Sequence, residues 1–120
     1  RHRGENMEKI LTIDGRQVRF KSTGAFLLRY KAQFGRDALQ DILRIQSAID
    51  NKGRIKNIDT LDLEVFYNLV WTLAKTADPS IPPPLEWLDE FSEFPLMDII
   101  PEIIDLIFSS LGATVEPKKK

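Results

Sequence analysis

The stretch from Leu61 to Ala77, LDLEVFYNLVWTLAKTA, decides the fold that we predict for this chain. At about 100° per residue, most of its apolar side chains fall side by side on one broad helical face. These side chains are Leu63, Phe66, Tyr67, Val70, Trp71, Leu73, Ala74 and Ala77. A face this wide can cover several neighbours, so we predict a central helix over 60–77 in a mainly helical core. Asp59 or Thr60 is the expected N-cap, and Pro79 should stop the helix.

Two apolar residues of this helix, Val65 and Leu69, do not follow that pattern. They lie four residues apart on the face that is otherwise polar. This position indicates either a second layer of packing within the chain or a surface reserved for a partner.

A β-hairpin is predicted near the start of the chain, over about residues 9–21. Asp14-Gly15 divides two alternating segments, and tight antiparallel turns favour this pair because both positions require positive φ. The register places Leu11 opposite Val18. Because a lone hairpin is marginal in water, its apolar face must pack on helices.

Four further helices follow from apolar periodicity and from capping residues, which gives a bundle of about five helices with the hairpin packed on it. We expect these four helices at about 25–34, 36–50, 84–91 and 97–111. Between the third and fourth helices of the chain lies Asp78 to Pro84, DPSIPPP, which we expect to be extended. It is either a stiff spacer or a ligand of the PxxP type.

The last predicted helix carries more apolar surface than one contact requires. Its arc is so wide that Ile99, Ile103 and Leu106 form a separate edge. We predict that this edge joins a partner in an oligomer, with full burial as the alternative. Together with Val65 and Leu69, these three residues are our candidates for partner binding.

Length and composition are those of one globular domain. The chain has 120 residues, 42% hydrophobic and 29% charged, so it holds one core of ordinary size. We assign residues 7–112 to this domain and 113–120 to a flexible tail. Residues 1–6 precede Met7, and we interpret them as a remnant of expression. No apolar run is long enough to span a membrane and no signal peptide is recognisable, so we expect a cytoplasmic protein.

Charge is distributed unevenly along the chain. Residues 1–58 carry a net +7 and residues 59–120 a net −8, which together give the formal −1. The two halves can neutralise each other within the fold, pair between subunits, or present a basic surface to nucleic acid. The candidate basic residues are Arg16, Arg19, Lys21, Arg29, Lys31, Arg36, Lys52, Arg54 and Lys56. The near-neutral total and the pI of about 5.9 argue against nucleic acid.

The residues that most catalytic sites require are missing from the predicted domain. The chain has no cysteine, and its single histidine is His2, so no Ser-His or Cys-His pair can form there. Asp98, Glu102 and Asp105 share one helical ridge, which is either a solvated face or a site for a hard cation. No calcium loop or glycine-rich phosphate loop accompanies them. We therefore predict a protein that is not an enzyme, with no catalytic, cofactor or metal site.

Three stretches together resemble a known family. They are VRFKSTGAFLLRYKAQFGRD, LEVFYNLVWTLAKTADPSIPPPLEWLDEF and FPLMDIIPEIIDLIFSSL. Over nearly all of Ile10 to Leu111 the chain is similar to the tail assembly chaperones of long-tailed phages and of prophages in Gram-positive bacteria. The similarity is one of overall pattern and contains no motif whose binding residues can be carried over.

This resemblance implies a mainly helical protein, without enzymatic activity, that acts in the host cytoplasm. Such chaperones bind the tape measure protein, help recruit tail tube subunits around it, and are absent from the mature virion. Many also have a longer form made by ribosomal frameshifting, and Lys118 to Lys120 are compatible with slippery codons. A nucleic-acid-binding regulator and a general helical interaction module remain the alternatives.

Overall fold

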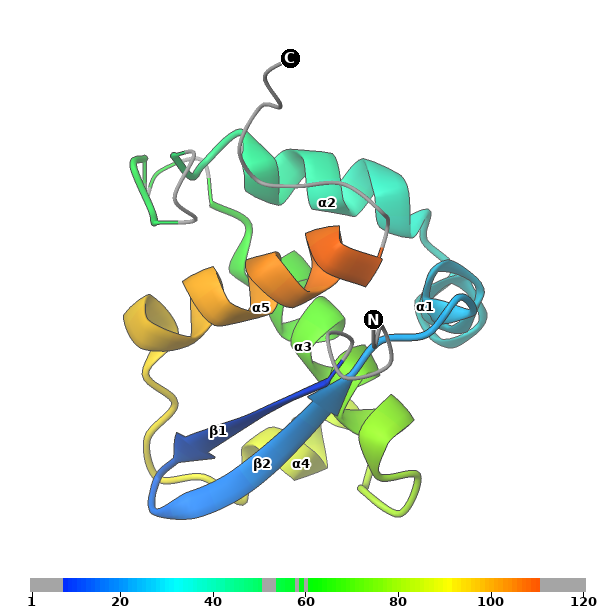
Figure 1. Ribbon diagram of the computed structural model, residues 1–120, viewed down its shortest axis with the longest axis vertical. Helices are drawn as coiled ribbons and strands as arrows, with labels where there is room; N and C mark the ends of the chain where they lie inside the picture. Colours follow the sequence, from blue (N-terminus) through cyan, green and yellow to red (C-terminus); the bar gives the residue numbers. More distant parts are fainter. Residues whose placement is uncertain (1–7, 51–53, 58, 60, 111–120) are drawn as a thin grey trace.

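Five helices and one β-hairpin make up the part of the chain that the computed structural model describes, which is residues 8–50, 54–57, 59 and 61–110. The elements are β1 (Glu8–Ile13), β2 (Arg16–Lys21), α1 (Phe26–Phe34), α2 (Ala38–Gln46), α3 (Leu63–Ala77), α4 (Pro84–Leu88) and α5 (Leu96–Ser110). Figure 1 shows α2, α5 and the hairpin arranged around α3. Since α3 contacts β2, α1, α2 and α4, the predicted central helix is confirmed.

The hairpin has the predicted turn and register. Asp14 and Gly15 have φ angles of 54° and 77°, and Leu11 lies opposite Val18. Val18 and Phe20 are buried against the helices, because the alternation of the strand turns them to the same face. The apolar face of the hairpin therefore forms part of the core.

The central helix begins three residues later than its sequence pattern predicts. Asp62 is the N-cap, and its carboxylate accepts a hydrogen bond of 3.3 Å from the Val65 N–H. Asp59 is exposed upstream of this cap, so it is not the N-cap, and Thr60 lies outside the described residues. The helix ends at Ala77, as expected from Pro79.

The second helix is shorter than the predicted 36–50. It begins after Asp37, whose side chain accepts hydrogen bonds from the N–H groups of Leu39 and Gln40. It ends at Gln46, because the chain then turns and Ile49 pairs with Ile55 in an isolated antiparallel bridge. A helix cannot continue through residues that form such a bridge.

The proline-rich loop is fastened to α3. The indole Nε1 of Trp71 donates to the carbonyl oxygen of Pro82 at 2.9 Å. The ammonium of Lys75 donates to the carbonyl oxygens of Pro79 and Ile81 at 2.7 and 3.0 Å. These bonds favour the interpretation as a stiff spacer over that of a free PxxP ligand.

Candidate functional site

The five residues predicted to bind a partner are all buried. Val65 and Ile99 are 2% exposed, and Leu69, Ile103 and Leu106 are 0% exposed. The prediction that they form a free surface is wrong for the folded single chain, because neighbouring elements cover α3 and α5 on those faces. The alternative readings, a second layer around α3 and full burial of the α5 edge, are correct.

Exposed apolar side chains occur elsewhere on the molecule. They are Ile10, Leu28, Leu39, Leu43, Leu63, Leu85 and Met97. Two of them, Leu63 and Met97, are 40% and 65% exposed and border the same groove. Single exposed apolar side chains are ordinary on a protein surface. An apolar groove bordered by two exposed apolar side chains is a candidate binding site.

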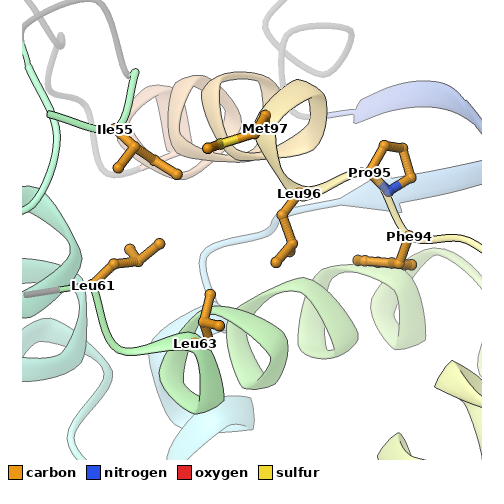
Figure 2. Close-up of a pocket in the computed structure, with 7 residues that line it drawn as sticks. All are labelled: Ile55, Leu61, Leu63, Phe94, Pro95, Leu96 and Met97. Carbon is orange, nitrogen blue, oxygen red and sulfur yellow. The ribbon is translucent and has the colours of Figure 1, made fainter. Parts of the chain in front are cut away.

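The groove lies between the N-terminal ends of α3 and α5 and has a volume of about 360 Å³. Its lining consists of Ile55, Leu61, Leu63, Phe94, Pro95, Leu96 and Met97. Figure 2 shows Leu63 and Leu96 pointing toward each other, with Ile55 and Met97 at the opposite border. Among the described residues, no charged side chain lines the groove, so it offers a ligand mainly apolar contacts.

Helix caps and an aromatic cluster position this lining. The Asp62 cap fixes the start of α3 beside Leu63, and the Pro95 carbonyl accepts the N–H groups of Asp98 and Ile99 at the start of α5. The Phe94 ring lies 5.7 Å from Tyr67 and 6.1 Å from Trp87 between ring centroids. Because Trp87 is 2% exposed, the Phe94 ring packs on a buried side chain, and this contact fixes one side of the groove in the core.

Three exposed carboxylates are sequence neighbours of residues that line the groove. Glu64 follows Leu63, Glu93 precedes Phe94 and Asp98 follows Met97, and all three are exposed. None of them forms an ion pair with another residue of the described part of the chain. On the opposite side, Arg54 and Lys56 flank Ile55, but Arg54 is 3.5 Å from Asp50.

A polar cluster of Tyr30, Arg36 and Asp41, away from the groove, joins α1 to α2. The Asp41 carboxylate accepts hydrogen bonds from the Tyr30 hydroxyl at 2.7 Å and from two nitrogens of Arg36 at 2.7 and 2.8 Å. Hydrogen bonding from the Arg36 guanidinium holds the pKa of Asp41 below its usual value, although burial opposes this. Burial raises the pKa of Tyr30, and the neighbouring carboxylate raises it further, so the hydroxyl remains a donor. The hydrogen bonds of this cluster connect α1 to α2.

The acidic ridge of α5 is engaged with the hairpin. The ammonium of Lys9 lies 2.7 Å from Glu102 and 3.0 Å from Asp105. Among the described residues, no group of three or more His, Asp or Glu side chains is arranged to hold a metal ion. Two of the three carboxylates of this ridge, Glu102 and Asp105, are therefore paired with Lys9 of the hairpin.

Several residues of the predicted basic set contact other parts of the fold. Arg16 lies over the Phe91 ring, 4.5 Å from its centroid, and Arg19 donates to the Ala77 carbonyl oxygen at 3.0 Å. Arg36 is bound to Asp41. Two ion pairs do join the basic and acidic halves, Lys9 with Glu102 at 2.7 Å and Arg16 with Glu90 at 3.3 Å. They fit the interpretation in which the two halves neutralise each other within the fold. No helix in the described residues is long and apolar enough to cross a membrane.

Comparisons of the chain with protein-family models, curated proteins and solved structures gave no match. The candidate site is an apolar groove with one side anchored in the core of a mainly helical domain. Such a groove is suited to the apolar face of a partner helix.

Proposed function

We propose that the protein is a tail assembly chaperone of a long-tailed phage or prophage, without enzymatic activity, and that the groove binds its client. The client is the tape measure protein, a long helical protein that needs its apolar faces covered before assembly. The chaperone acts in the host cytoplasm, helps bring tail tube protein to the client, and is absent from the mature virion. A second copy of the chain and a longer frameshifted form are further partners.

The observation that carries this proposal is the anchored groove between α3 and α5. An amphipathic helix binds in such a groove through apolar residues spaced three or four apart. Leu63 and Met97 are the exposed residues at its border, so they are available to a client without unfolding of the chaperone. The resemblance to tail assembly chaperones identifies which helical client to test.

Co-expression with the tape measure protein tests this function. The gene to use is the long helical reading frame that we expect immediately downstream. The wild-type chain should keep its product soluble and should copurify with it. The double variant Leu63→Gln/Met97→Gln should lose both effects, because polar side chains weaken apolar contacts in the groove.

The matched control is Leu28→Gln/Leu85→Gln, which changes two leucines that are more exposed and lie outside the groove. This control should behave as wild type. A groove variant that still solubilises the tape measure protein would refute the role of the groove. Failure of the wild-type chain to bind it, together with binding to duplex DNA that weakens steeply with salt, would favour the nucleic-acid alternative.

A further inference from the structure

Another pocket lies between α1 and α3, and charged and polar side chains line part of it. Its volume is about 240 Å³. Its lining consists of Arg29, Ala32, Gln33, Trp71, Thr72, Lys75 and Thr76. None of these residues lines the groove between α3 and α5, so the proposed client site leaves this pocket unexplained.

Both charged residues of this lining are cations. Arg29 is exposed and forms no ion pair with another residue in the part of the chain that the structure describes. The ammonium of Lys75 donates to two carbonyl oxygens of the proline-rich loop, which are neutral acceptors. Asp78 interacts electrostatically with Lys75, but it accepts hydrogen bonds from Ser80 and does not line the pocket. The lining therefore carries positive charge without a carboxylate in it.

Most hydrogen-bonding groups that the pocket leaves for a ligand are donors. The hydroxyls of Thr72 and Thr76 already donate to carbonyl oxygens of α3, at 2.9 and 2.8 Å. The Arg29 guanidinium has five N–H donors, the Gln33 amide has two, and the Lys75 ammonium has a third hydrogen beyond the two that it donates to the loop. A carboxylate is the acceptor that suits such a set, because its two oxygens match the fork of a guanidinium.

The apolar part of the lining is held in place. The indole Nε1 of Trp71 donates to the Pro82 carbonyl oxygen, and the Trp71 ring packs edge-to-face with Phe34, with 5.8 Å between ring centroids. The Lys75 ammonium lies 5.8 Å from the centroid of the Trp71 ring. Because these contacts already order the indole, a flat ligand that packs on it orders few further side chains.

We infer that this pocket binds a small organic anion that has one carboxylate and a flat apolar body. The carboxylate accepts hydrogen bonds from Arg29 and Gln33, close to the charge of Lys75. The apolar body lies against Trp71 and Ala32. The ligand is small, because drug-sized sites have roughly 300–1,000 Å³ and this pocket has about 240 Å³. The inference goes beyond the proposed function and does not depend on it, since the two sites share no residue.

Benzoate is the probe that tests this inference, and the side-chain N–H signals of the two tryptophans in a nitrogen–proton correlation spectrum of the full chain are the readout. Benzoate should shift the Trp71 signal with a Kd of about 1–10 mM. The Trp87 signal is the internal control and should stay in place, because Trp87 is buried and does not line this pocket. Benzyl alcohol has the same ring without the charge, so it should bind at least about five-fold more weakly.

Two variants with the same change of charge on the same helix test the role of Arg29. Arg29→Gln should weaken benzoate binding about five- to ten-fold, because it removes a charged donor that lines the pocket. Lys31→Gln is the matched control, since Lys31 is exposed on α1 outside the lining, and it should bind benzoate as wild type does. The rest of the spectrum shows whether each variant is folded, and the comparison with benzyl alcohol needs no variant.

The inference is overturned if the Trp71 signal does not approach saturation by about 50 mM benzoate, or if benzyl alcohol binds as tightly. It is also overturned if Arg29→Gln binds as wild type, or if Lys31→Gln loses as much affinity, because charge anywhere on α1 would then suffice. Inorganic phosphate should bind at least about five-fold more weakly than benzoate, and equal affinity would overturn the inferred apolar body. None of these results bears on solubilisation of the client, so the proposed function is tested separately.

Discussion

Removal of the Asp41 charge is the perturbation whose effect on stability is best defined by this structure. The Asp41 side chain is 3% exposed and accepts three hydrogen bonds of 2.7 to 2.8 Å from Tyr30 and Arg36. In Asp41→Asn, the NH2 group of the new amide faces an N–H donor of Arg36, so one hydrogen bond is replaced by a contact between two donors. Breaking a buried pair by removing one partner costs about 3–5 kcal/mol. Because Arg36 is 43% exposed and can be hydrated, we expect a loss of about 3 kcal/mol.

Two variants measure the parts of this cluster separately. Tyr30→Phe removes one hydrogen bond to a charged acceptor but leaves Arg36 in place, so it should cost about 1.5 kcal/mol. Arg44→Gln removes a pair whose atoms are 3.7 Å apart and whose arginine is 61% exposed, so its cost should stay below about 0.5 kcal/mol. Urea denaturation followed by circular dichroism gives all three free energies of unfolding.

The pH dependence of the free energy of unfolding checks independently that the Asp41 carboxylate stabilises the fold. The pKa of Asp41 is lowered in the folded state, so the carboxylate stabilises the fold above the unfolded-state pKa of about 3.9. This contribution is lost as the pH falls through the folded-state pKa. The stability gap between wild type and Asp41→Asn should therefore narrow as the pH falls from 7 through that range. A gap below about 0.5 kcal/mol at pH 7, or one that widens on acidification, would refute this reasoning.

Three further changes test other parts of the fold. Ile103→Asp places an unpaired carboxylate at a position that is 0% exposed, so it should abolish the cooperative thermal unfolding transition; a stably folded variant would contradict the burial of α5. Gly15→Ala should cost about 1 kcal/mol in urea denaturation because Gly15 has a φ of 77°, whereas Gly24→Ala, with open space around it, should cost less. Lys9→Gln should cost about 1 kcal/mol, because it removes the ion pairs that join β1 to α5; no change in stability would mean that these pairs are fully replaced by water.

Local chemistry made most of the fold predictable. The Asp14-Gly15 turn determines the register of its own hairpin, and the apolar period between Leu63 and Ala77 identifies the central helix. Helix ends were less predictable where several capping residues compete. Asp62 is the cap of α3, although Asp59 and Thr60 are equally suitable by residue type.

Burial was the property that the sequence could not determine for the partner-binding candidates. Periodicity shows that Ile103 and Leu106 share an edge of α5, but it does not show how many neighbours cover that edge. In the fold these residues are 0% exposed. Val65 and Leu69 lie on the second packed side of α3 for the same reason.

The groove itself could not be recognised in the sequence. Its lining comes from the segment that contains Ile55, from the start of α3, and from the residues before and within the first turn of α5. Ile55 and Leu63 are 8 residues apart, but Leu63 and Phe94 are 31 residues apart, and no local pattern links these two parts of the lining. One signal was present: Phe94, Pro95, Leu96 and Met97 are four apolar residues in succession at a helix start, which is more than one helical face can bury.

Hydrogen–deuterium exchange of the protein, alone and with the proposed tape measure client, tests most directly whether the groove is the client site. The account predicts slower exchange at backbone amides in residues 61–64 and 94–98 when client is bound, with unchanged exchange in α4. Protection confined to other segments, with residues 61–64 and 94–98 exchanging as in the free protein, would contradict it.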